Sequence, residues 1–171
     1  MLQIKPLRFA VLALALVGAA ACEDDSPAAL VPETFGAVLA GTNEVPAVTT
    51  SATGTASFTA VGDTAISYTI QVNNLTGITM AHIHAAGAGV NGGVVAWLLP
   101  PNGTAPQTAS GTVNGSLATG RITAAWIRGL SGQPAITLDS LKSLMRSGNA
   151  YVNVHTSTNG GGEVRGQITS N

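Results

Sequence analysis

Apolar and polar residues alternate in short segments along most of this chain, and this alternation predicts β-strands. Successive side chains of a strand point to opposite faces of a sheet, so a half-buried strand repeats with a period of two. The clearest example is the segment 65–72, where Ile66, Tyr68 and Ile70 share one face. The sequence predicts strands over 35–40, 53–60, 65–72, 78–85, 94–99, 110–117, 121–127, 150–156 and 163–169.

One segment has helical spacing instead. Leu138, Leu141, Leu144 and Met145 recur as on one face of a helix, which predicts a helix over about 138–147. Thr137 or Asp139 is suited to cap its start. About eight strands and one short helix predict an all-β fold, an antiparallel β-sandwich with Greek-key-like connections, formed by a single domain over 34–171.

Composition narrows the possible functions. Charged residues make up only 9% of the 171 residues, and no Lys/Arg cluster exists to neutralise phosphates, which argues against a nucleic-acid partner. A serine-hydrolase Gly-x-Ser-x-Gly elbow is absent from the sequence. Glu44 and Glu163 are the only credible carboxylates for acid–base chemistry. We therefore expect a module without enzymatic activity.

The N-terminus has the features of an export signal. Lys5 and Arg8 precede an apolar run over 9–18 that is shorter than the ~20 residues a membrane-spanning helix needs. Small residues at 19–21 then precede Cys22, the only cysteine. This arrangement resembles a bacterial lipoprotein signal, with Ala19 standing where leucine is usual.

Two interpretations of this junction remain open. In the first, residues 1–21 are a signal peptide, Cys22 is lipidated, and 22–33 is a flexible tether, which makes the protein an exported bacterial lipoprotein facing the periplasm or the exterior. In the second, ordinary signal-peptidase cleavage leaves a free thiol at Cys22. A lone cysteine directly at the junction favours the first interpretation, with the membrane as a partner through Cys22.

The three histidines all lie in predicted strands. His82 and His84 are separated by one residue and therefore share a face. If the apolar residues of the last two strands face the core, the opposite, outer face carries Asn153, His155, Glu163, Arg165 and Gln167. If the two histidine strands are neighbours, we expect all three imidazoles to lie within about 8 Å of one another.

This polar face allows two interpretations. His82, His84 and His155 form a possible copper or zinc site, with Glu163 as a possible hydrogen-bond partner that orients a ligand. Alternatively, the imidazoles form structural hydrogen bonds that stiffen the face. Met80, also on this face by parity, would suit Cu(I).

Other residues have mainly structural interpretations. We expect Glu44 and Arg165 to form an ion pair that holds the 41–46 loop on the sheet, and Trp97 and Trp126 to belong to the core. A His-x-His strand motif also occurs in copper/zinc superoxide dismutase, another β-sandwich. Three histidines are too few for its copper and zinc sites, so that activity is not expected here.

Several motifs in order resemble the CHRD domain, which is named for chordin and also occurs in bacterial envelope proteins. The resemblance covers about residues 34–169, and it departs from the family at Gly160-Gly161-Gly162, where Asn-Pro often precedes Gly-Glu. It implies a β-sandwich outside the cytoplasm and a binding or structural module with no established enzymatic role. The matching runs are 41–46, 81–85, 91–95, 151–156 and 162–168.

Overall fold

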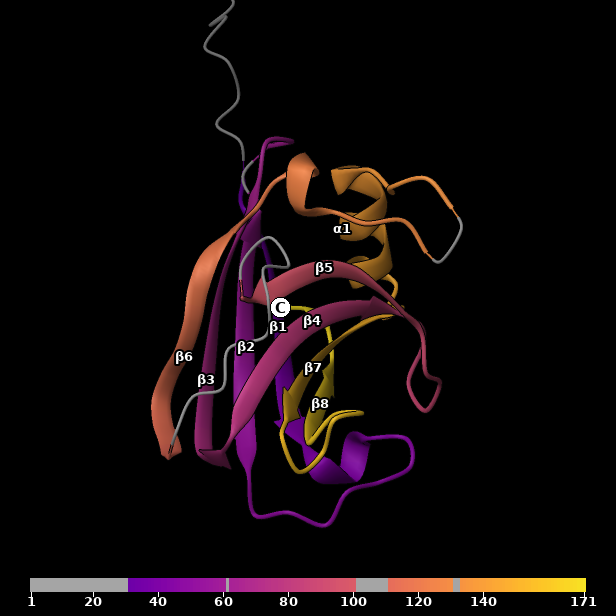
Figure 1. Ribbon diagram of the computed structural model, residues 1–171. Coiled ribbons are helices and arrows are strands. Elements are labelled where there is room, and N and C mark those ends of the chain that lie inside the picture. The colour runs from indigo at the N-terminus through magenta and orange to yellow at the C-terminus, as the bar shows by residue number, and fades with distance from the viewer. Residues whose placement is uncertain (1–30, 61, 101–110, 131–132) are drawn as a thin grey trace, which may run out of the picture.

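The computed structural model describes residues 31–60, 62–100, 111–130 and 133–171 (Figure 1). The predicted signal peptide, Cys22 and most of the predicted tether lie outside the described residues. No helix within the described ranges is long and apolar enough to cross a membrane.

The described residues form one antiparallel sheet in the order β5-β4-β7-β8-β1-β2-β3-β6, with the short β9 beside β1. Within these described residues, one α-helix, α1 (Leu138–Arg146), and two 3-10 turns accompany the sheet: η1 (Gly41–Asn43) and η3 (Ala124–Trp126). The strands are β1 (Glu33–Ala40), β2 (Thr53–Ala60), β3 (Ile66–Thr76), β4 (Ile78–Ala85), β5 (Gly93–Leu99), β6 (Thr112–Ile122), β7 (Ala150–Thr156), β8 (Val164–Gln167) and β9 (Thr169–Ser170).

The predicted all-β antiparallel class is confirmed, and its two layers are halves of one folded sheet. Strands β3 and β4 are separated in sequence only by Gly77, yet β3 pairs with β2 and β6 whereas β4 pairs with β5 and β7. Gly77 makes this change of direction with φ +68°, a value that favours glycine. Figure 1 shows β4 and β5 crossing in front of β1 and β2, and the hydroxyl of Tyr68 in β3 donates to the Leu98 carbonyl of β5 at 2.7 Å.

The core lies between these two halves and follows the predicted alternation. Ile66, Tyr68 and Ile70 of β3 are buried, as expected from their shared face. The same core contains the apolar residues of β4 and β7, including Ile83, whose inward direction the sequence also predicts. The polar side chains between them must therefore lie on the opposite face of β4 and β7.

The helix prediction is confirmed over Leu138–Arg146. The Thr137 hydroxyl accepts a hydrogen bond from the Ser140 amide at 3.1 Å, which identifies Thr137 as the N-cap. Leu141 and Met145 are fully buried against the sheet.

Several strand boundaries differ from the predictions. Strand β3 continues to Thr76, and the strand expected over 163–169 is divided into β8 and β9. The separate strands expected over 110–117 and 121–127 are a single strand, β6, followed by η3. Gly120 lies inside β6, and a Cβ at this position would fall 2.7 Å from the Tyr68 hydroxyl, so this glycine allows close approach rather than ending a strand. The first strand begins at Glu33, inside the predicted tether, where Glu33 accepts two hydrogen bonds from Arg146 at 2.7 Å.

Candidate metal site on strands β4 and β7

Strands β4 and β7 are neighbours, which brings all three histidines onto one side of the sheet. In their register, Met80 lies opposite His155, His82 opposite Asn153, and His84 opposite Tyr151. The register continues outward, with Trp97 of β5 opposite His82 and Arg165 of β8 opposite Asn153.

The expected convergence of the imidazoles is confirmed. One ring nitrogen from each of His82, His84 and His155 lies within 4.8 Å of the other two. Nδ1 of His82 and Nε2 of His155 are only 3.0 Å apart. Strand parity therefore predicts this cluster correctly.

The expectation that this is an exposed outer face is wrong. His82, Asn153, His155 and Arg165 are all buried, with 4%, 3%, 7% and 2% of their surface exposed. Three loops fold back over the face. The loops that contain Val45 and Asn91 are joined because Asn91 donates to the Val45 carbonyl at 2.8 Å. The third loop contacts the face through the Gly160 carbonyl, which is hydrogen-bonded to His155. Strand alternation cannot predict this cover, because it depends on where loops return in space.

Backbone carbonyls set the protonation of two rings. The Gly92 carbonyl oxygen lies 2.9 Å from Nδ1 of His84, and the Gly160 carbonyl oxygen lies 3.0 Å from Nδ1 of His155. A carbonyl only accepts hydrogen bonds, so both Nδ1 atoms carry the proton and both neutral rings keep a lone pair on Nε2. Nδ1–H of His82 then donates to Nε2 of His155, and His82 also keeps its Nε2 lone pair.

Burial favours the neutral form of all three rings. It lowers the pKa of His82 to about 3, with a further contribution from the neighbouring His155 and His84. Burial also lowers the pKa of His84 and of His155, although hydrogen bonds to the Gly92 and Gly160 carbonyls act in the opposite direction. Near neutral pH the cluster therefore presents uncharged imidazoles, the form that binds metal ions.

Aromatic rings hold the imidazoles in place. The Trp97 ring meets His82 edge-on, with centroids 4.2 Å apart, and Tyr151 stacks on His84 at 4.8 Å and an interplanar angle of 8°. The sequence predicted Trp97 as a core residue, but it is half-buried and packs on the cluster. Trp126, also expected in the core, is partly buried against it.

The predicted ion pair between Glu44 and Arg165 does not form. Glu44 instead accepts hydrogen bonds from Asn153 Nδ2 at 2.8 Å to Oε1 and 3.0 Å to Oε2. The Arg165 guanidinium donates to Asn91 Oδ1 at 3.0 Å and to the Val90 carbonyl at 2.7 Å, and lies 3.3 Å from the centre of the Tyr151 ring. Arg165 does not pair with Glu44 because the 86–92 loop supplies the acceptors for its guanidinium, and residue type alone does not reveal these acceptors.

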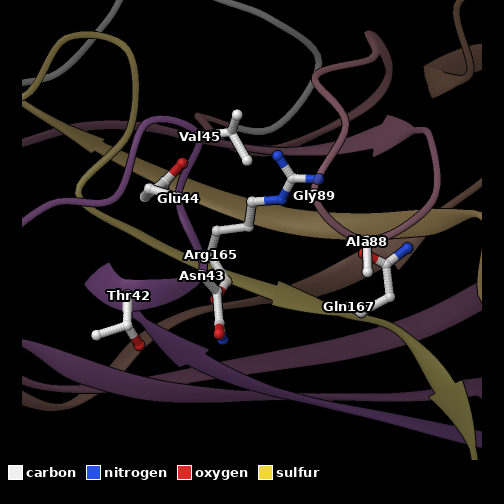
Figure 2. A pocket seen from close by; sticks show the side chains of 8 residues that line it. All are labelled: Thr42, Asn43, Glu44, Val45, Ala88, Gly89, Arg165 and Gln167. Atoms are coloured by element: carbon white, nitrogen blue, oxygen red, sulfur yellow. The ribbon is translucent and has the colours of Figure 1, made fainter.

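Glu44 and Arg165 nonetheless interact at longer range beside a cavity of about 330 Å³. Figure 2 shows Arg165 extending between the Glu44–Val45 segment and Gly89. Burial raises the pKa of Glu44 to about 7, while the Arg165 charge and the Asn153 hydrogen bond act to lower it. The Glu44 carboxyl is thus poised to change charge near neutral pH.

Glu163 does not orient His155 in the way the sequence suggested. Its carboxylate accepts hydrogen bonds from Thr50 at 2.8 Å, Thr156 at 2.7 Å and Asn159 at 3.2 Å. The Nδ1 partner of His155 is the Gly160 carbonyl. Carbonyls at Gly92 and Gly160 carry no residue-type signal, so only the structure identifies them.

Three buried side-chain polar atoms in the described part of the chain lack a hydrogen-bond partner. They are Nε2 of His82, Nε2 of His84 and Oδ1 of Asn153. All three belong to residues of β4 and β7 on the same face. Buried polar groups are normally paired, so this concentration of unpaired acceptors marks a site that can receive a ligand.

The fold and site define a small all-β module with a three-histidine cluster in which His82 and His155 are buried and His84 is partly buried. The family model described as the CHRD domain matches residues 35–168, so the chain belongs to the CHRD family. At the level of the family this supports a non-enzymatic module, and CHRD domains are typically extracellular or secreted. Comparison with curated proteins and with solved structures found no match to this chain.

Proposed function

We propose that this protein is a non-enzymatic module of the bacterial cell envelope that binds one copper or zinc ion through His82, His84 and His155. The observation that carries the proposal is the fixed protonation of the rings. Two backbone carbonyls hold Nδ1–H of His84 and His155, which leaves Nε2 of each ring as a lone pair. Metal-binding histidines typically have such a partner on the nitrogen that does not bind the metal.

The spacing of the nitrogens is compatible with this role. Nitrogens bound to one tetrahedral zinc ion at about 2.0–2.1 Å lie roughly 3.3 Å from one another. One nitrogen of each ring lies within 4.8 Å of the other two, and rotation of the rings would be needed to reach this spacing. The ion would replace the hydrogen bond between His82 and His155, because Nε2 of His155 cannot accept that bond and bind the ion at once.

The competing structural interpretation explains less of the site. A purely stiffening network would pair its buried polar atoms, because each unpaired one costs about 1–3 kcal/mol. Here Nε2 of His82 and Nε2 of His84 are both unpaired and buried. A bound cation would satisfy both.

Calorimetric titration of the purified protein with zinc and with copper tests the proposal. The Cys22→Ser variant serves as the reference, because it removes the thiol as a competing ligand. We expect one ion per chain, and binding at least about 100-fold weaker in His84→Ala, because loss of a ligand costs more than the ~10–100-fold typical of losing a residue that only orients one. No binding heat with the reference protein, or unchanged affinity in His84→Ala, would refute the proposal.

We further propose that Cys22 is lipidated and anchors the module to a membrane. The support is the sequence pattern, in which small residues at 19–21 directly precede the only cysteine. Mass spectrometry of the mature N-terminus should show cleavage before Cys22 and added acyl mass, and Cys22→Ser should remove both. An unmodified Cys22 in the mature protein refutes the anchor without affecting the metal proposal.

A further inference from the structure

We infer that Oδ1 of Asn153 is a fourth, oxygen ligand of the metal ion, that Glu44 is the residue that positions it, and that the site therefore selects a divalent ion of the zinc class. This inference rests on the proposed metal-binding function. It adds a ligand, a positioning residue and a choice of metal that the histidines alone do not supply.

The position of Asn153 places it beside the histidines. Asn153 lies directly opposite His82 in the β4–β7 register and two residues before His155 on β7. Because alternate residues of a strand share a face, its side chain lies on the face of the cluster. Only 3% of its surface is exposed.

Glu44 determines the orientation of the Asn153 amide. The Nδ2 group donates to both Glu44 oxygens, at 2.8 Å and 3.0 Å. Whether Glu44 is ionised or protonated, at least one of its two oxygens only accepts, so a flipped amide would bring Oδ1 against an acceptor. The pairing thus keeps Nδ2 on Glu44 and turns Oδ1 away from it.

Gly162 makes room for this pairing. A Cβ at Gly162 would collide with both Asn153 Nδ2 and Glu44 Oε1. Glu44, Asn153 and Gly162 therefore form one packed unit directly beside the histidine strand β7.

The unpaired atoms then form a consistent set. Oδ1 of Asn153 and Nε2 of His82 and His84 are all buried acceptors without a donor. One cation can bind several acceptor atoms at once. These three atoms cannot pair with one another, because none of them carries a hydrogen to donate. On the same face, Asn153 lies directly opposite His82 in the register and carries an oxygen that can bind a metal ion.

The resulting ligand set indicates the class of metal. Imidazole nitrogens with one amide oxygen suit zinc, cobalt(II) or copper(II), whereas Cu(I) prefers thiolate and thioether ligands. Met80 is the thioether on this strand, opposite His155, and in this arrangement it is not a ligand. Met80→Leu is therefore a matched control, changed on the same strand and retaining similar volume.

Zinc affinity and the visible spectrum of the cobalt(II)-loaded protein test the inference, because cobalt absorption responds to ligand identity. All variants are made in the Cys22→Ser chain. We expect Asn153→Leu to weaken zinc binding by about tenfold or more and to change the cobalt spectrum, while Met80→Leu changes neither.

A charge-conserving exchange keeps the test decisive if Asn153→Leu does not fold. In Glu44→Gln with Asn153→Asp, the amide at 44 donates to one oxygen at 153, and the other oxygen remains for the metal. We expect this double variant to retain zinc binding with an altered cobalt spectrum, because a carboxylate replaces an amide as ligand. A spectrum identical to that of the reference would overturn the role of Asn153.

The outcomes separate this inference from the proposed function. If the reference protein binds no metal, the proposed function fails. If it binds metal, and Asn153→Leu or the exchange variant leaves affinity within about twofold and the cobalt spectrum unchanged, only the Asn153 inference fails. A loss of affinity in Met80→Leu would likewise overturn the choice of ligand set.

Discussion

Nδ1 of His82 lies 3.0 Å from Nε2 of His155, and this contact completes a chain of hydrogen bonds that begins at a backbone carbonyl. The Gly160 carbonyl accepts from Nδ1–H of His155, so Nε2 of His155 is free to accept from His82. The geometry of the 157–162 loop therefore determines where the proton of His82 resides.

We predict that the metal-free protein has all three imidazoles in the Nδ1–H form near neutral pH. Burial lowers the pKa of each ring, so the rings are neutral, and the Gly92 and Gly160 carbonyls select the protonated nitrogen. Long-range ¹H–¹⁵N NMR correlations distinguish the two nitrogens of each ring. Nε2–H signals for His84 and His155 would contradict the hydrogen-bond assignment.

The metal-free protein should also lose stability in acid. The folded pKa of each ring is depressed, to about 3 for His82, below the unfolded value of about 6.5. The unfolded chain then binds more protons, so the free energy of unfolding falls as the pH decreases through this window. Urea denaturation with a chelator, from about pH 7 to pH 4, measures the slope, and His82→Gln should make it shallower. An unchanged slope in that variant would contradict the assigned pKa.

Parity predicts the histidine cluster because it is a local property of strands. His82 and His84 share a face whatever the topology is, and His155 joins them once β4 and β7 pair. The same reasoning places Asn153 and Arg165 on that face correctly. It does not predict their burial, because the loops that cover them approach from distant parts of the chain.

The hydrogen bonds that determine the chemistry of the site cannot be predicted from residue type. The acceptors for His84 and His155 are glycine carbonyls. Arg165 is held by Asn91 and Val90 from a loop whose glycine-rich composition predicts only a turn. A charge pair between Glu44 and Arg165 was the simpler expectation. Instead, Glu44 is hydrogen-bonded to the Asn153 amide, and Arg165 to the Asn91 amide and the Val90 carbonyl. These neutral groups bind a charged side chain without carrying the opposite charge.

Glu44→Gln should change how stability depends on pH in the opposite sense to the histidines. Burial raises the folded pKa of Glu44 from 4.5 to about 7, despite the Arg165 charge and the Asn153 hydrogen bond. The folded chain then binds this proton more tightly, so its contribution to stability is lost as the pH rises from about 4.5 to 7. Removing the carboxyl should make the free energy of unfolding rise more steeply with pH across that range.

The pH dependence of the free energy of unfolding is measured by urea denaturation, and Glu33→Gln is the matched control for Glu44→Gln. In the unaltered protein, the hydrogen bond with Arg146 lowers the pKa of the Glu33 carboxyl. The stability that the ionised Glu33 contributes is therefore lost as the pH falls. Loss of that carboxyl should flatten the slope at low pH, so the two glutamate variants are expected to differ in sign. Equal slopes in both variants would contradict the raised pKa of Glu44.

Gly162→Ala should destabilise the protein and weaken its metal site. Gly162 has φ +131°, a backbone conformation that side chains rarely adopt, and an added Cβ would collide with Asn153 and Glu44. We expect a loss of about 1–3 kcal/mol in the free energy of unfolding, as is typical of such backbone strain. Because the collision displaces the Asn153–Glu44 pair, zinc affinity should fall as well.

Gly160→Ala tests whether this effect is specific, because it changes the same loop. A Cβ at Gly160 meets no atom within 4 Å, and the carbonyl that accepts from His155 belongs to the backbone and is retained. We expect its free energy of unfolding to remain within about 0.5 kcal/mol of the reference. Urea denaturation and zinc titration of both variants measure the difference. Equal losses at Gly160 and Gly162 would show that the loop as a whole tolerates no side chain, and would remove the evidence that Gly162 supports the Asn153–Glu44 pair.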